Sequence, residues 1–263
     1  MTKIIAVANQ KGGVGKTTTS VNLSAALAAT KRRVLVVDLD PQGNATTGLG
    51  LDKKNLEHSV YDVLMDEAFD PATAVLHSES GQLDVLPGNA DLTSAKNELL
   101  GQDGAQLRLK NQLSRIANNY DYIVIDCPPA LNMLTVNALA AASGVLVTMQ
   151  CEYYALEGLA DLIENIDAIR DALNPELELE GLLRTMYDPR MSLTNEVSSQ
   201  LAEHFGDKLY QTVIPRNIRL AEAPSFGTPV IHYDRQSKGA QAYLALAAEM
   251  LRRHGALNEP KKA

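Results

Sequence analysis

Short apolar runs alternate along the chain with longer segments whose apolar residues recur at helical spacing. The short runs are rich in Val, Ile and Leu, as is typical of parallel strands that are covered on both faces. We expect strands at residues 3–8, 34–38, 83–86, 122–126, 145–149, 181–186, 211–214 and 230–233. We expect helices at residues 17–29, 107–118, 133–142, 156–173, 193–205 and 239–253. The alternation predicts an α/β fold with a mostly parallel, twisted sheet and helices on both faces.

No linker, repeat or low-complexity tract interrupts this series. We therefore expect one domain over residues 1–254 and a flexible tail at residues 255–263. No apolar stretch approaches the roughly 20 residues that span a bilayer, and the N-terminus lacks the pattern of a secretory leader. These features predict a cytoplasmic protein. Cys127 and Cys151 belong to no C-x-x-C or Cys/His cluster, so we expect two reduced, structural thiols.

Charge is distributed unevenly along the chain, whose 263 residues carry a net charge of −8. Residues 52–107 hold eleven acids against three lysines and account for that whole balance, whereas residues 235–263 are basic. An acidic total therefore does not exclude a local basic face. Residues 59–64 have helical apolar spacing, so the acidic region either covers the sheet or faces a partner, and the composition leaves both open.

A glycine-rich loop directly follows the first predicted strand and leads into the first predicted helix. Its sequence is Lys11-Gly12-Gly13-Val14-Gly15-Lys16-Thr17-Thr18. Glycines let consecutive backbone N–H groups surround a phosphate, and the helix N-terminus adds partial positive charge. In this context Lys16 can reach the β- and γ-phosphates, and the Thr17 hydroxyl can ligate Mg²⁺. The loop predicts nucleotide binding.

Two further predicted strands end in carboxylates. Asp126 ends an apolar strand, which is the Walker B arrangement that holds Mg²⁺ directly or through water. Asp38 and Asp40 stand at the carboxyl end of the strand at residues 34–38, where side chains two residues apart point to the same side. Ligands of open α/β sheets bind at this edge, so we expect these carboxylates close to the phosphate loop.

The loop also has a specific variant form, because Gln10 replaces the first glycine of the common motif and Lys11 adds a second lysine. Further motifs are Val37-Asp38-Leu39-Asp40-Pro41-Gln42-Gly43-Asn44, Ile125-Asp126-Cys127-Pro128-Pro129, Gln150-Cys151-Glu152-Tyr153-Tyr154-Ala155-Leu156-Glu157-Gly158 and Ile214-Pro215-Arg216-Asn217-Ile218-Arg219-Leu220-Ala221-Glu222-Ala223-Pro224. With these motifs the sequence resembles the deviant Walker A ATPases of the ParA/MinD superfamily, and within them the ParA/Soj chromosome-partitioning proteins. The resemblance covers nearly the whole chain.

The resemblance implies a slow, Mg²⁺-dependent ATPase in which Asp40 orients the attacking water and Asp38 supports the Mg²⁺ shell. It implies that Lys11 reaches across an ATP-sandwiched homodimer to the partner's phosphates, where it neutralises developing charge as an arginine finger does. It also implies that Pro215 and Asn217 contact the adenine base, and the Asn217 amide has the donor and acceptor for an amino-purine edge.

The resemblance further implies that the dimer binds double-stranded DNA without sequence preference. Arg190 and Arg219 match the positions implicated in this contact, and Arg216 is a weaker candidate. Residues 181–220 carry only +1, so composition adds little. A ParB-type centromere-binding partner is implied to stimulate hydrolysis and release the dimer from the nucleoid, for a chromosome or a plasmid. Because the first strand begins at Lys3, with no helix-turn-helix before it, we expect no operator-specific repression.

Three alternative functions stay open. A MinD-like membrane-cycling ATPase would carry a C-terminal amphipathic helix, but the segment at residues 239–253 is dominated by Ala, so we expect it to pack in the core. An iron–sulfur ATPase would need a cysteine placement that Cys127 and Cys151 do not reproduce. An ATP-dependent amidase or synthase would need a second substrate pocket, for which the sequence carries no signature.

Overall fold

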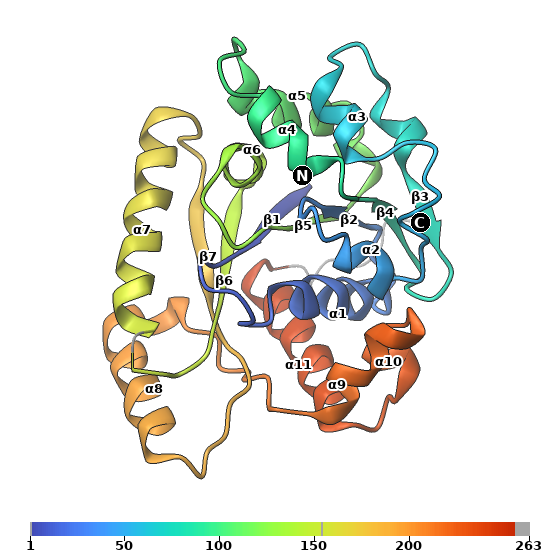
Figure 1. The fold of residues 1–263 in the computed structure, drawn as a ribbon. Helices are drawn as coiled ribbons and strands as arrows, with labels where there is room; N and C mark the ends of the chain where they lie inside the picture. The colour runs from blue at the N-terminus through green and yellow to red at the C-terminus, as the bar shows by residue number, and fades with distance from the viewer. Residues whose placement is uncertain (1, 154, 256–263) are drawn as a thin grey trace.

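The computed structural model describes residues 2–153 and 155–255, and a seven-stranded sheet crosses the middle of these residues (Figure 1). The strands are β1 (Lys3–Ala8), β2 (Val34–Asp38), β3 (Leu76–Ser78), β4 (Leu83–Leu86), β5 (Tyr122–Asp126), β6 (Gly144–Met149) and β7 (Glu178–Arg184). They lie in the order β3-β4-β2-β5-β1-β6-β7, and only the β3–β4 pair is antiparallel. The predicted fold class is confirmed.

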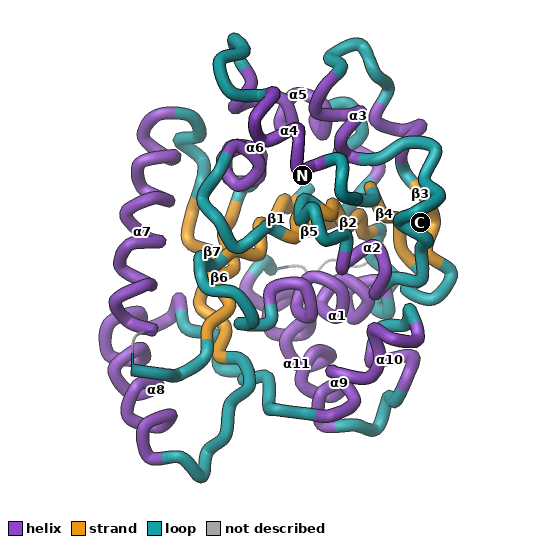
Figure 2. The backbone as a smooth tube through the Cα atoms, in the orientation of Figure 1, coloured by secondary structure: helices purple, strands orange, loops and turns teal. Residues whose placement is uncertain are grey.

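Helices lie on both sides of the strand layer (Figure 2). They are α1 (Lys16–Ala28), α2 (Asn44–Gly48), α3 (Val60–Met65), α4 (Leu92–Glu98), α5 (Arg108–Ser114), α6 (Met133–Ala141), α7 (Ala155–Ala172), α8 (Ser192–Phe205), α9 (Ile218–Glu222), α10 (Val230–Tyr233) and α11 (Lys238–Arg253). Short 3₁₀ turns are η1 (Pro71–Ala74), η2 (Ala105–Leu107), η3 (Ala117–Asn119), η4 (Gly206–Lys208) and η5 (Ala223–Phe226). The predicted helices are present, whereas α2, α4, α9 and α10 were not expected.

The sheet separates two apolar cores. In β1, Ile5 and Val7 pack in the core that contains α1 and α11, whereas Ala6 and Ala8 pack in the core that contains α3 to α7. This is the consequence of strand geometry, because successive side chains point to opposite faces. As expected, the segment at residues 239–253 packs in the core, since Tyr243, Leu246 and Met250 of α11 are buried.

Two strand predictions were wrong. Residues 230–233 form α10, where the backbone N–H of Val230 donates to the side chain of Asn22 on α1 at 2.7 Å. Residues 211–214 form no strand: the N–H of Ile214 donates to the Arg184 carbonyl of β7 at 2.9 Å, but the N–H groups of Gln211 and Thr212 donate to the Glu249 carboxylate at 2.8 Å each. In both places a side chain from a distant helix supplies the backbone partner, and no local pattern carries that information.

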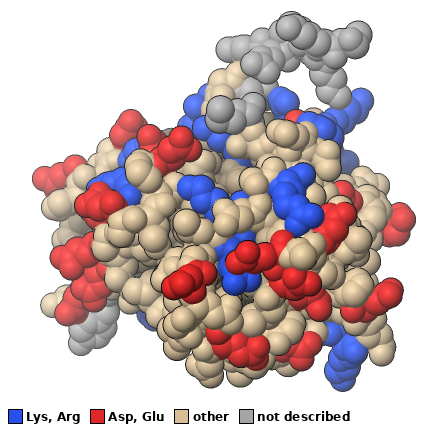
Figure 3. Space-filling model, turned by 90° about the horizontal axis from the view of Figure 1, so that it is seen from above, with Lys and Arg blue, Asp and Glu red and all other residues tan. Residues whose placement is uncertain are grey.

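The acidic region covers one face of the sheet. Its helices α3 and α4, with the residue that follows α4, bury apolar side chains in the core of that face, namely Val60, Val63, Leu64, Leu92 and Leu99. Figure 3 views the molecule from this side and shows acidic side chains interspersed with basic ones. Of the expected tail, residues 256–263 lie outside the described residues. Within residues 2–153 and 155–255, no helix combines the length and the apolar character that a bilayer crossing requires.

Candidate functional site

The phosphate loop connects β1 to α1 at the carboxyl edge of the parallel strands. Gly13 and Gly15 have φ angles of +73° and +83°, a backbone region that favours glycine, and α1 begins at the next residue, Lys16. Neighbouring strands fix the loop from outside. The Gln150 side chain donates to the carbonyl of Gly13 at 3.0 Å, and the Thr185 hydroxyl donates to that of Val14 at 2.8 Å. The loop is therefore held in shape by the fold itself.

Lys16 lies inside this loop with only 7% of its surface exposed. Its Nζ donates to the carbonyl oxygen of Lys11 at 3.0 Å, so the side chain folds back under the loop. Burial lowers the pKa of Lys16, and the nearby charges of Asp126 and Asp40 oppose that shift. A phosphate in the loop would supply the anion that this buried ammonium group lacks.

Asp126 is the centre of the second part of the site. Its carboxylate is fully buried and accepts hydrogen bonds from the Thr17 hydroxyl at 2.7 Å and the Ser20 hydroxyl at 2.8 Å. Both donors come from the first turns of α1, one turn apart. Burial raises the pKa of Asp126, and the charge of Asp38 raises it further. The fold thus brings together Thr17 and Asp126, the two residues that the sequence suggests as Mg²⁺ ligands.

Asp38 lies beside Asp126, because the two residues are register partners in the parallel β2–β5 pair. Asp38 is also fully buried, and it accepts bonds from the backbone N–H and the hydroxyl of Thr46, both at 2.7 Å. Burial is the main cause that raises its pKa, with the charge of Asp40 adding to it. Two neighbouring buried carboxylates repel each other, and this repulsion favours the binding of a cation between them.

The donor set fits Mg²⁺. A hydroxyl and buried carboxylates are hard oxygen ligands, and Mg²⁺ is usually held by one or two carboxylates together with substrate phosphates and water. Among the described residues, no group of three or more His, Cys, Asp or Glu side chains is arranged to hold a metal by itself. Thr17 and Asp126 are the residues that would hold the ion beside a bound nucleotide.

Asp40 follows β2 in the turn that leads to α2. Its backbone N–H donates to Asp38 at 3.3 Å, and its own carboxylate accepts the N–H of Gln42 at 2.9 Å. Asp40 is partly buried, unlike the fully buried Asp38. Its charge adds to the burial and the Asp38 charge that raise the pKa of Asp126, and it opposes the burial that lowers the pKa of Lys16. The expected water-positioning residue therefore stands at the open side of the site.

A cavity of about 190 Å³ opens beside the loop. Its lining includes Gly15 and Thr18 from the loop and α1, Pro215 and Asn217 from the chain before α9, and Tyr243 from α11. The two residues expected to contact adenine thus line a pocket that adjoins the phosphate loop. The Asn217 side-chain oxygen accepts the N–H of Arg219 at 3.1 Å and caps α9.

Comparison with known proteins places this site in a family. A family model described as an AAA domain matches residues 2–179. The chain is 52% identical over 250 residues to the sporulation initiation inhibitor protein Soj of Bacillus subtilis, covering 95% of this chain and 98% of that protein. It is 49% identical over 252 residues to the chromosome partitioning protein ParA of Myxococcus xanthus, covering 95% and 88%. The chain belongs to the ParA/Soj family.

A solved structure extends the comparison of this ParA/Soj family member. The cobyrinic acid a,c-diamide synthase of Mycobacterium smegmatis, crystallised with an ATP analogue and magnesium, has 37% identity and a TM-score of 0.83, covering 98% of each chain. The fold is therefore shared beyond proteins that are named for partitioning.

The Lys11 side chain of this ParA/Soj family member points away from the phosphate loop and toward Glu152. Its Nζ pairs with the Glu152 carboxylate at 2.5 Å, and both side chains are about half exposed, at 55% and 49%. Its backbone N–H donates to the Asn9 side chain at 2.9 Å. The ammonium group thus faces solvent and Glu152.

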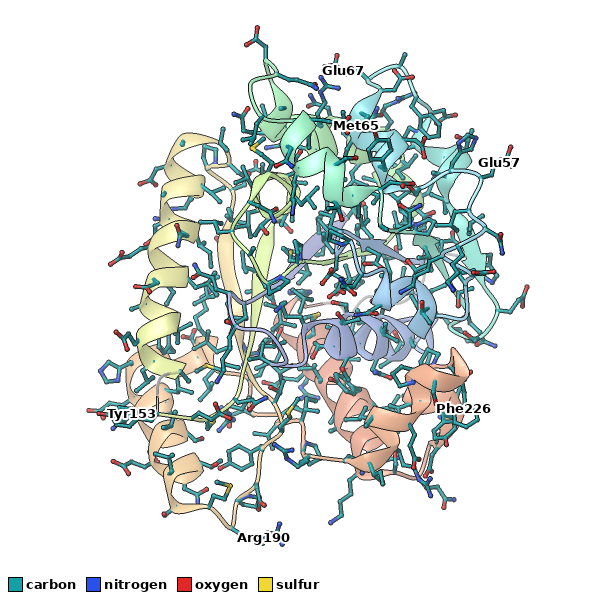
Figure 4. The ribbon with its side chains drawn as sticks, in the orientation of Figure 1. Glu57, Met65, Glu67, Tyr153, Arg190 and Phe226 are labelled. Carbon is teal, nitrogen blue, oxygen red and sulfur yellow. The ribbon has the colours of Figure 1, made fainter. Side chains whose placement is uncertain are left out.

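The arginines expected at DNA are all at the surface, but two of them are paired. Arg190 makes two bonds to the Asp188 carboxylate, at 2.9 and 2.6 Å, and holds the pKa of Asp188 down at about 2. Arg219 pairs with Glu222 at 2.8 Å and with Asp234 at 3.2 Å. Figure 4 shows Arg190 at the tip of the loop between β7 and α8, well away from Phe226 on η5. Arg216 is exposed.

Sequence reasoning missed several residues that complete the site. Ser20 is one helical turn after Thr17, so its spacing could have marked it. Thr46 and Thr185 gave no such signal, because each joins its partner through tertiary structure, and Glu152 belongs to a quoted motif that did not indicate its pairing with Lys11. The two cysteines are buried, as expected of structural thiols, and burial raises the pKa of Cys151 to about 11.

Proposed function

We propose that this protein is a Mg²⁺-dependent ATPase that partitions chromosomes or plasmids. ATP binds with its phosphates in the loop of Gly12, Gly13, Val14 and Gly15 and its adenine in the cavity at Pro215 and Asn217. Lys16 and Thr18 contact the phosphates, while Thr17 and Asp126 hold Mg²⁺ with support from Asp38. The buried lysine and the facing carboxylates support this assignment, because burial disfavours the charge of each, and triphosphate and Mg²⁺ would supply opposite charge at contact distance.

Hydrolysis transfers the γ-phosphoryl group to water. Asp40 orients the attacking water from the open side of the site, and Lys16 neutralises charge that develops on the transferred group. Mg²⁺ held by Thr17 and Asp126 would neutralise negative charge on the phosphate oxygens. Intrinsic turnover is slow because in each monomer Lys11 pairs with Glu152 outside the phosphate loop. Lys11 completes the site only in an ATP-sandwiched homodimer, where it reaches the partner's phosphates.

The dimer binds double-stranded DNA without sequence preference through Arg190, Arg219 and Arg216. Such contacts need only placed guanidinium groups, so the affinity falls steeply as salt rises. A ParB-type centromere-binding protein stimulates hydrolysis and thereby releases the dimer. The working location is therefore the cytoplasm, on the nucleoid. ATP acts as a switch, since only the γ-phosphate distinguishes the DNA-binding state.

The observation that carries this proposal is that near-50% identity to ParA and Soj extends over 95% of the chain. The test is co-sedimentation of the purified protein with random-sequence DNA and, separately, with anionic liposomes, each without nucleotide, with ADP or with Mg–ATP. We expect ATP-dependent binding to DNA alone. ATP-dependent binding to liposomes alone would replace partitioning with MinD-like membrane cycling.

A second candidate function is ATP-dependent amidation, because the 37%-identical structural relative is named a diamide synthase. That chemistry consumes ATP to activate a carboxylate for an amine donor. Steady-state ATP turnover with and without glutamine and a corrinoid carboxylate separates the two functions. Partitioning predicts no response to these compounds and a response to DNA with a ParB-type protein.

A further inference from the structure

The corner formed by α9 and α10 contains one arginine that is held by two acids from different elements. Arg219 Nη1 lies 2.8 Å from a carboxylate oxygen of Glu222, one turn later on α9. Arg219 Nε lies 3.2 Å from a carboxylate oxygen of Asp234, which follows α10. The two acids therefore occupy two edges of the guanidinium group, which are the edges that a phosphate uses in bidentate contact.

The surroundings of this cluster of Arg219, Glu222 and Asp234, here called the clasp, are basic. Arg216, Arg235 and Lys238 are exposed, and none of the ion pairs formed by the described residues includes them. Arg216 precedes α9, Arg235 directly follows Asp234, and Lys238 begins α11. Among these four cations of the described residues, Arg219 is therefore the one that forms ion pairs.

We propose that Glu222 and Asp234 are built-in competitors for phosphate at Arg219, which limit the affinity of this corner for DNA. The proposal rests on the DNA binding proposed above. A DNA phosphate and the two carboxylates compete for the same guanidinium group, so a phosphate that binds there displaces the acids. After release, both acids stay close to the phosphate backbone and repel it.

The clasp can be displaced because it is only partly buried. The Arg219 side chain is 46% exposed, and those of Glu222 and Asp234 are 36% and 34% exposed. Water and salt screen pairs of this kind, so they contribute little net stability. The phosphates of DNA therefore displace the two acids, but the affinity for DNA is lower than it would be without them. A lower affinity of this kind lets hydrolysis release the protein.

Neutral substitutions of the two acids test this directly. Glu222→Gln keeps an acceptor for the Tyr233 hydroxyl at 3.4 Å, and Asp234→Asn keeps one for the N–H of Gln236 at 3.2 Å. Affinity for a labelled random-sequence duplex is measured by fluorescence anisotropy with Mg–ATP over a series of salt concentrations. We expect each substitution to raise DNA affinity about threefold at moderate salt, and the double variant about tenfold.

The matched control is Glu164→Gln on α7, which removes the same charge from an exposed residue of a distant helix. We expect its DNA affinity to equal that of the unsubstituted chain. The gain must also vanish when Glu222→Gln and Asp234→Asn are combined with Arg219→Ala. Thermal unfolding and ADP binding confirm that each variant is folded.

The outcomes separate the two proposals. An equal gain in the Glu164→Gln control, or a gain that persists with Arg219→Ala, would show an effect of net charge alone and overturn the competition. Unchanged or weaker binding in Glu222→Gln and Asp234→Asn, with Arg219→Ala still defective, would overturn the competition and leave DNA binding intact. Failure of the unsubstituted chain to bind DNA in any nucleotide state would instead overturn the proposed function.

Discussion

Two regions of the molecule use charge in opposite ways. One is the nucleotide edge, the end of the parallel strands with Lys16, Asp38 and Asp126, and the other is the α9–α10 corner with Arg219. At the edge, Asp126 and Asp38 are fully buried, and hydroxyl groups of α1 and α2 hold them in fixed positions. At the corner, Arg219 is about half exposed and shares its charge with two surface acids. Burying a charged group costs desolvation free energy, but it holds the group in position for one ligand. Exposed ion pairs are weak, so they exchange partners easily. The fold thus holds the buried carboxylates in fixed positions, whereas Arg219 at the surface can change its partner.

Lys16→Ala should have the largest effect and should act on the edge alone. Loss of a buried charge partner costs about 3 to 5 kcal/mol, so affinity for a fluorescent ATP analogue should fall roughly 1,000-fold. Titration in the presence of Mg²⁺ measures it. Lys54→Ala, an exposed lysine, is the control and should bind normally. Retained affinity in Lys16→Ala would contradict the assignment of the loop.

Asp40→Ala should separate chemistry from binding. Because Asp40 is proposed to orient water, its loss should slow ATP hydrolysis roughly 100-fold or more. Binding of ATP should persist, and with it the dimer and its DNA contact. Phosphate release and DNA co-sedimentation measure the two properties on the same sample. Hydrolysis at the unsubstituted rate would show that another group positions the water.

The prediction for Lys16 comes from the loop sequence itself, whereas the role of Asp40 comes from the resemblance to the ParA/Soj family. The glycine loop and Asp126 are local signals, since a strand, a loop and a helix follow one another directly. The bounds of β1, β2, β4 and β5 agree with the expected ranges because buried parallel strands are continuous apolar runs.

Other features could not be predicted because their causes are distant in the chain. Val230–Tyr233 has the composition of a strand, but it forms a helical turn whose first N–H is bound by Asn22. Thr46 holds Asp38 across eight residues, and Asp234 reaches Arg219 from another helix. A family motif marks Arg219, but only the fold shows which acids it meets.

Arg219→Glu tests the corner itself. Both protomers of a dimer would lose a cation and gain an anion, so DNA affinity with Mg–ATP should fall roughly tenfold or more. ATP binding should not change. Arg190→Glu provides a comparison on a separate loop, where the arginine has one acid partner and its side chain is 87% exposed. A defect in Arg190→Glu alone would place the DNA contact at that loop.

Thr46→Val tests whether the edge is held by its hydrogen bonds. The substitution removes the hydroxyl that donates to Asp38 at 2.7 Å and accepts the N–H of Gly88 at 3.0 Å. Leaving buried polar groups unsatisfied costs about 1 to 3 kcal/mol, and urea unfolding without nucleotide should show that loss. Thr47→Val, on the exposed side of α2, should cost less. Equal losses would mean that Asp38 does not depend on this hydroxyl.

Glu152→Gln should have the smallest effect. It breaks the Lys11–Glu152 ion pair, which lies at the nucleotide edge but is partly exposed, as the ion pairs of Arg219 are. Lys11 and Glu152 are about half exposed, so solvent screens their attraction. The free energy of unfolding in urea should change by less than about 1 kcal/mol. Glu157→Gln on α7 removes the same charge from an exposed residue and should behave alike. A loss well above that of this control would show that Lys11 is fixed in place like the buried carboxylates. A small loss would place Lys11 with Arg219, as a cation whose present partner can be exchanged for phosphate.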